Sequence, residues 1–186
     1  VDRWCVVSTV GTSLISNLAR EQSRDLNELL RNIANEPEQA LDADTKRSVS
    51  LLADRVLDTV DTADTSRLRR MSAELNGLVS LYGERLFQPE RRALDMHYLI
   101  ATDTYLGMMS ADLLALILEQ LGFNTVIKPQ FAGLTTKSYR SFSDGISRLV
   151  EWCHRELPPH RSPNSRIIFN LVGSFKSLQA YMNTLG

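Results

Sequence analysis

The fold is decided by the stretch Val6-Val7-Ser8-Thr9-Val10-Gly11-Thr12-Ser13-Leu14-Ile15. Its first half is rich in β-branched residues, which is typical of a buried strand. The strand pattern stops at Gly11, and Thr12 or Ser13 can cap an apolar helix that follows. A strand, a tight turn and a helix N-terminus are therefore predicted, and the free N–H groups and dipole at that junction suit a phosphate. A turn that binds nothing is the alternative at this point.

Length and charge limit the classes of function. The chain has 186 residues, enough for one domain with a sizeable core, and its formal net charge is -1. No bulk positive field attracts it to long nucleic acid or to an anionic membrane, so any anionic ligand must be small and held by local groups. Cys5 and Cys153 are predicted to be reduced core residues. With no apolar run near the ~18 residues of a membrane helix, and no signal-peptide pattern, a cytoplasmic protein is expected.

Strands alternate with helices along the chain. After the first strand, at 4–10, apolar stretches with strand character lie at 96–101, 124–128 and 166–171. This alternation predicts an α/β fold, a Rossmann-like parallel sheet flanked by helices, with right-handed crossovers. The simplest winding gives the strand order 3-2-1-4.

Helical periodicity fills the segments between these strands. Residues 1–186 are expected to form one domain with a helical insertion over about 36–92, placed after the first strand and its helices. Within it, residues 44–82 are predicted to form a helical hairpin of two helices joined by a polar turn at 61–65. Other helices are expected at 13–21, 23–34, 110–121 and 176–184, and around 142–153.

The predicted winding reverses between the first and fourth strands, and ligands of open parallel sheets bind at the carboxyl ends of strands at such a reversal. The two loops at this point are Gly11-Thr12-Ser13 and Gly173-Ser174-Phe175-Lys176. Each combines a glycine turn with a helix N-terminus, and the serines add hydroxyl donors. A lysine at a helix start is mildly unfavourable without an anionic partner. The loops therefore predict an anion site, and a surface lysine is the alternative interpretation of Lys176.

Four stretches resemble the CARF (CRISPR-associated Rossmann-fold) domains of APE-type CRISPR-associated proteins. They span nearly the whole chain in the right order and are Ser8-Thr9-Val10-Gly11-Thr12-Ser13-Leu14, Ser72-Ala73-Glu74-Leu75-Asn76, Ala101-Thr102-Asp103-Thr104 and Ile168-Phe169-Asn170-Leu171-Val172-Gly173-Ser174-Phe175-Lys176. The last is the most specific. It departs from the family, which often has Thr-Gly-Gly-Phe-Lys at 172–176, and the change affects how closely a phosphate can approach.

The resemblance implies a sensor of type III CRISPR immunity. Such a domain forms a homodimer and binds a cyclic oligoadenylate, with cyclic tetra-adenylate favoured, across the two-fold axis. No metal or cofactor is implied, and a C-terminal effector domain is expected to be absent from residues 1–186 or truncated in them. The implied ligand-binding residues are Gly11, Thr12, Ser13, Gly173, Ser174, Phe175 and Lys176 for the phosphates, and Thr102, Asp103, Thr104 or the loop 131–136 for the adenines.

Two alternatives to a pure sensor stay open. Ser13 and Lys176 match in type and position the serine and lysine of ring nucleases of this fold, which cleave the ring without a metal to 2′,3′-cyclic phosphates. Since neither loop contains a histidine, no general base is expected and cleavage would be slow. The second alternative is a protein-interaction or regulatory module without a nucleotide ligand.

Other motifs are interpreted as structural. The pairs Arg92/His97 and Arg155/His160 have the Arg-x4-His spacing of HEPN ribonucleases, which is expected by chance in a chain with many arginines. His97 lies in a predicted strand and is expected to be a buried structural histidine. The motif residues Glu74 and Asn76 are assigned to helix packing, with contact to a ligand or a partner subunit as the alternative.

Overall fold

A four-stranded parallel sheet forms the centre of the computed structural model, which describes residues 2–135, 137–173, 178 and 182. Its strands are β1 (Arg3–Val10), β2 (Met96–Ala101), β3 (Thr125–Ile127) and β4 (Ser165–Asn170). Their order is β3-β2-β1-β4 and every pairing is parallel. The predicted Rossmann-like α/β fold and strand order are confirmed.

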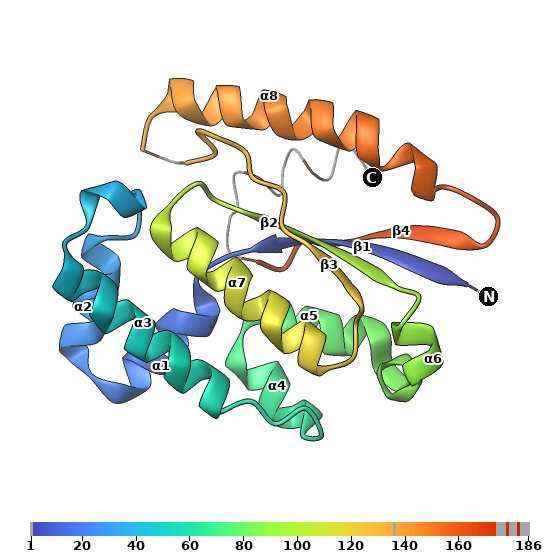
Figure 1. Ribbon diagram of the computed structural model, residues 1–186, viewed down its shortest axis with the longest axis horizontal. Helices are drawn as coiled ribbons and strands as arrows, with labels where there is room; N and C mark the ends of the chain where they lie inside the picture. The colour runs from blue at the N-terminus through green and yellow to red at the C-terminus, as the bar shows by residue number, and fades with distance from the viewer. Residues whose placement is uncertain (1, 136, 174–177, 179–181, 183–186) are drawn as a thin grey trace.

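Helices cover both faces of the sheet (Figure 1). One face carries α8 (Tyr139–Glu156), and the other carries α1 (Ser13–Gln22), α5 (Ala73–Tyr82) and α7 (Tyr105–Gln120). The remaining elements, in chain order, are α2 (Arg24–Asn32), η1 (Glu38–Ala40), α3 (Ala43–Asp58), α4 (Thr65–Met71), η2 (Gly83–Phe87), α6 (Pro89–Arg92) and η3 (Pro158–His160). None of the helices in the described part of the chain has the length and apolarity needed to cross a membrane.

The core has one hydrophobic cluster on each face of the sheet. On the α7 side, α7 lies between the sheet and α3, which explains why most of its sides are apolar. On the α8 side, Trp152 packs edge-on against Tyr98 and Phe131, and Leu178 and Met182 join the same cluster. Cys5 and Cys153 are buried and free, as predicted.

The predicted two-helix hairpin at 44–82 is wrong, because the segment forms three helices. Ser72 interrupts the second predicted helix: its backbone is extended, and its Oγ accepts a hydrogen bond from Leu75 N at 3.1 Å, which starts α5. Helix α7 similarly begins at Tyr105 rather than at residue 110, since the Thr104 side chain caps it by accepting from Gly107 N. The helix predicted at 176–184 lies outside the described residues, apart from 178 and 182.

A buried ion pair ties the end of the insertion to the start of β1. Arg85 donates to both carboxylate oxygens of Asp95, at 2.9 Å and 2.7 Å. Asp95 also accepts from Trp4 N at 2.7 Å, and the Arg85 guanidinium lies 4.4 Å from the centre of the Trp4 ring. The geometry is bidentate and charge-assisted, so the pair fixes this junction firmly.

His97 is a structural residue, as predicted. It is fully buried in β2, its Nε2 lies 3.0 Å from the Tyr82 hydroxyl, and its ring meets Phe123 edge-on at 4.5 Å. Removal from water disfavours the imidazolium and lowers the pKa of His97 to about 3.

This lowered pKa predicts acid sensitivity. The unfolded chain takes up a proton at His97 below about pH 6.5, whereas the folded chain does so only near pH 3. The stability associated with His97 is therefore complete above pH 6.5 and is lost toward pH 3, by at most about 1.4 kcal/mol per pH unit. Urea unfolding between pH 4 and pH 7 should show a shallower decline for His97→Gln than for wild type. His154→Gln, which changes an exposed histidine, should keep the wild-type slope.

Candidate functional site

The carboxyl ends of β1, β2 and β4 bring the predicted loops to one edge of the sheet. Val10 pairs with Ala101 and Ser8 pairs with Asn170, so the residues that follow these strands emerge side by side. The loops are Gly11–Ser13 after β1, Thr102–Thr104 after β2, and the segment from Leu171 to Gly173 after β4. This is the edge at which parallel sheets with a reversal bind ligands.

The turn Gly11–Ser13 is held by a carboxylate from the inserted helices. Gly11 N donates to Glu74 Oε1 at 2.7 Å, and Ser13 Oγ donates to Glu74 Oε2 at 2.6 Å. Ser13 Oγ also accepts from Ala73 N at 3.3 Å. Glu74 is only 1% exposed, and its charge is stabilised by these two donors and by the N-terminus of α1.

Helix α5 is positioned so that Glu74 reaches this turn. The Ser72 cap starts the helix, which places Glu74 in its first turn. The side chain of Asn170, at the end of β4, donates to the Glu74 carbonyl oxygen at 3.3 Å and to Ser8 Oγ at 3.4 Å. A Cβ on Gly77 would lie 2.3 Å from Asn170 Oδ1, so only a glycine allows α5 to pack this closely against β4.

Gly173 brings the second predicted loop against the first. A Cβ on this residue would lie 2.1 Å from the Thr9 carbonyl oxygen and 3.0 Å from Glu74 Oε1. The backbone after β4 therefore crosses directly over the end of β1, beside the carboxylate that holds Gly11. Ser174, Phe175 and Lys176 lie outside the described residues, and their roles stay predictions.

The polar residues after β2 support one another. The hydroxyl oxygens of Thr102 and Thr104 are 2.9 Å apart, and Thr104 caps α7. Asp103 binds the 131–134 segment twice: its N–H donates to the Leu134 carbonyl oxygen, and its Oδ2 accepts from Gly133 N, both at 2.8 Å. These side chains fix the conformation of the loop at the carboxyl end of β2.

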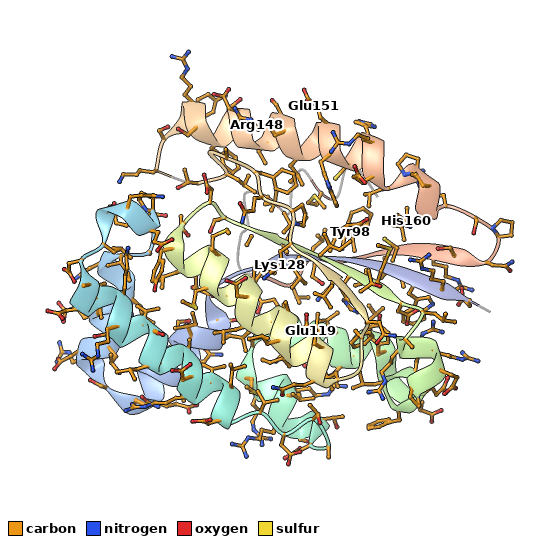
Figure 2. The ribbon with its side chains drawn as sticks, in the orientation of Figure 1. Tyr98, Glu119, Lys128, Arg148, Glu151 and His160 are labelled. Atoms are coloured by element: carbon orange, nitrogen blue, oxygen red, sulfur yellow. The ribbon has the colours of Figure 1, made fainter. Side chains whose placement is uncertain are left out.

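Two pockets open beside these residues. The smaller, of about 130 Å³, lies at the ends of β2 and β3, and Ala101, Asp103, Met108 and Phe131 are among its lining residues. The larger, of about 540 Å³, extends from Asp103 toward η1. Asp103 and Asp112 line both, and Lys128, labelled in Figure 2, is paired with Asp112. This acidic lining disfavours a phosphate and suits an uncharged group with N–H donors.

A third pocket lies away from this edge. Its volume is about 310 Å³, and it is formed by α1, α3 and α4, with Leu14, Val56, Arg67 and Arg70 in its lining. Among the described residues, none of those predicted to bind a ligand is in its lining.

The Arg-x4-His pairs do not form a site at this edge. His160 lies beside Tyr98, 3.3 Å from its hydroxyl, toward the end of the sheet where the strands begin (Figure 2). Arg155 pairs with Glu156 on the surface of α8. Arg92 donates to the Leu121 carbonyl oxygen, and His97 is buried, so both arginines have other partners.

Sequence reasoning gave Glu74 the wrong role. The prediction assigned it to helix packing, whereas its carboxylate binds the Gly11–Ser13 turn. The sequence places Asn170 only within a motif, and its amide in fact joins β4 to Ser8 of β1 and to Glu74 of α5. One signal in the sequence could have indicated this role. In the stretch Ser72-Ala73-Glu74-Leu75-Asn76, Glu74 stands directly before a core leucine, and a carboxylate near the core needs hydrogen-bond donors. Asn76 is exposed and accepts from Arg69 at 3.2 Å.

Comparison with known proteins gives one family match. Residues 69–186 match the family described as CRISPR-associated protein (Cas_APE2256). The matched region includes Glu74, the loop after β2 and the segment after β4. No curated protein matches the chain.

The close packing at Gly77 predicts the sign of a substitution. Alanine favours a helix interior by roughly 0.5–1 kcal/mol relative to glycine. Overpacking costs about 1–3 kcal/mol, and a Cβ at 2.3 Å from Asn170 Oδ1 requires a shift. Gly77→Ala should therefore lower the free energy of unfolding by about 1–2 kcal/mol. Asn76→Ala, at the exposed neighbouring position, should change it by less than about 0.5 kcal/mol; equal urea midpoints for the two variants would contradict this packing.

Proposed function

We propose that this chain, which belongs to the CRISPR-associated protein (Cas_APE2256) family, is a type III CRISPR sensor that binds a cyclic oligoadenylate. Membership of this family confirms the resemblance to APE-type CRISPR-associated proteins. The CARF assignment, the ring ligand and the homodimer are parts of the proposal. Cyclic tetra-adenylate is the favoured ring, because its two-fold symmetry fits an isologous dimer in which each subunit contacts half of it.

The approach of the two glycine turns is the observation that carries the proposal. Gly173 lies against the carbonyl of Thr9, and Gly11 comes two residues later, just after the end of β1, so backbone that follows two strands meets beside the N-terminus of α1. A helix N-terminus and closely approached backbone are suited to phosphate oxygens. In the proposal, Lys176 of the same loop adds the positive charge that the phosphodiester needs.

The neighbouring pockets support the placement of the bases. The 130 Å³ pocket combines apolar walls, such as Ala101 and Phe131, with the carboxylate of Asp103. An adenine is uncharged and offers an exocyclic amine to such an acceptor, whereas a phosphate would be repelled. Phosphates at the β1 and β4 ends and bases toward the β2 end would thus use opposite local charges.

Ligand binding predicts a stabilised chain. Cyclic tetra-adenylate at 100 times its Kd should raise the free energy of unfolding by about 2.7 kcal/mol, measured as a thermal shift. Lys176→Ala should weaken binding about tenfold or more, because a charge-assisted contact to phosphate is lost. Native mass spectrometry should show two chains and one ring. Lys46→Ala, which removes a charge paired with Glu38 in the insertion, serves as the matched control.

The outcome that would contradict the sensor is a flat thermal shift with rings of four and six adenylates. That result would favour a regulatory or interaction module without a nucleotide ligand. Tight binding of the six-membered ring alone would keep the sensor and change its ligand.

A ring nuclease is the second candidate, and the contact between Ser13 and Glu74 favours it. Sequence reasoning found no general base, but a carboxylate lies 2.6 Å from Ser13 Oγ. A ribose 2′-hydroxyl held at Ser13 would pass its proton to Oγ while the Ser13 proton moves to Glu74. The 2′-oxygen then bonds to phosphorus, the P–O5′ bond breaks, and the leaving oxygen takes a proton from water, which is restored by the proton that Glu74 received. The product is a 2′,3′-cyclic phosphate.

This candidate predicts a linear product from labelled cyclic tetra-adenylate with protein in molar excess. Ser13→Ala should reduce the single-turnover rate by about 10²-fold or more, since the proton path is broken. Ser16→Ala, in the same helix, should keep the wild-type rate. An intact ring after prolonged incubation with wild type would exclude the nuclease and leave the sensor.

A further inference from the structure

Glu74 already occupies the donors that a phosphate would use at the Gly11–Ser13 turn. Its two carboxylate oxygens accept from Gly11 N at 2.7 Å and from Ser13 Oγ at 2.6 Å. These distances are typical of charge-assisted hydrogen bonds. The side chain is almost completely buried, so water does not compete for these contacts.

The single hydroxyl proton of Ser13 cannot serve Glu74 and a ligand at the same time. A serine hydroxyl has one proton to donate, and a carboxylate only accepts. While Ser13 donates to Glu74, its hydroxyl has no proton for a phosphate oxygen. A phosphate placed on the Gly11 N–H would also meet the Glu74 carboxylate at close range, and two negative charges at that distance repel each other in a site removed from water.

We infer that Glu74 is an internal anion that competes with the ligand's phosphate for the Gly11–Ser13 turn. This inference rests on the proposed sensor for the identity of the ligand, and it excludes the ring-nuclease candidate, in which Ser13 keeps its contact with Glu74 while the ring is bound. Binding at the turn exchanges one anion for another: Glu74 releases Gly11 and Ser13, and a phosphate oxygen takes them. Glu74 therefore lowers the affinity for the ring and determines how much of it is needed for response.

The exchange also connects the ligand to the inserted helices. Glu74 belongs to the first turn of α5, and its backbone carbonyl oxygen accepts a hydrogen bond from the Asn170 side chain. Releasing the carboxylate removes the side-chain contacts between α5 and the turn but keeps the contact with β4. The contacts of α5 with the Gly11–Ser13 turn therefore differ between the state in which the turn binds the Glu74 carboxylate and the state in which it binds a phosphate.

Glu74→Gln is the central test. Its amide oxygen can still accept from Gly11 N, while its N–H₂ donates to Ser13 Oγ, so the serine proton becomes available and one negative charge is removed. Cyclic tetra-adenylate should bind this variant about tenfold more tightly than wild type in calorimetry. Glu90→Gln removes the same charge at an exposed position in α6, next to the start of β2, and should keep the wild-type affinity.

A second arm uses inorganic phosphate and does not depend on the ring. At matched ionic strength, replacing chloride with phosphate should raise the melting temperature of Glu74→Gln and, more strongly, of Glu74→Ala, in which both donors are open. Wild type and Glu90→Gln should respond less than either. Circular dichroism of each variant checks that it is folded.

The two arms separate the inference from the proposed function. Tighter ring binding by Glu74→Gln supports both. If no variant binds the ring but phosphate stabilises the two Glu74 variants selectively, the sensor fails and the competition by Glu74 holds. Ring binding that is equal or weaker in Glu74→Gln, with no selective effect of phosphate, overturns the inference and leaves the sensor in place.

Discussion

The hydrogen bonds from Gly11 and Ser13 to the Glu74 carboxylate are the constraint on which the rest of this edge depends. A buried carboxylate without such donors would be strongly destabilising, and the end of β1 would have polar groups without partners. The surrounding residues fit this contact: Gly77 admits Asn170, and Gly173 passes over Thr9. The helical insertion is therefore part of the candidate site rather than an addition to a finished sheet.

Much of the fold could be predicted because its signals are local. The strand at 96–101 is a stretch that is apolar except for His97 and is bounded by Asp95 and Thr102, and its predicted limits are the observed ones. The strand order followed from the simplest winding that right-handed crossovers allow. The break at Ser72 was missed because apolar residues continue with helical spacing on both sides of it.

The candidate site could be predicted only in part, for a different reason. Both glycine turns carry local signals, so their position at one edge followed from the strand order. Glu74 is 63 residues from Gly11 in the sequence, and its contact depends on the path of the four α-helices, α1 to α4, that lie between them. No periodicity indicates which buried position of α5 faces a turn that lies so far away in the chain.

The insertion is fastened to the sheet layer at both of its ends. At its beginning, the Glu36 carbonyl accepts from Tyr105 N and its carboxylate pairs with Lys137, while at its end Arg85 pairs with Asp95. The connection between α3 and α4, at residues 59–64, is mostly polar, and none of its residues is fully buried. A protease that nicks the chain there would leave two fragments that stay associated, because each is anchored independently to the same body. The insertion could thus tolerate a cut backbone and still deliver Glu74 to its place.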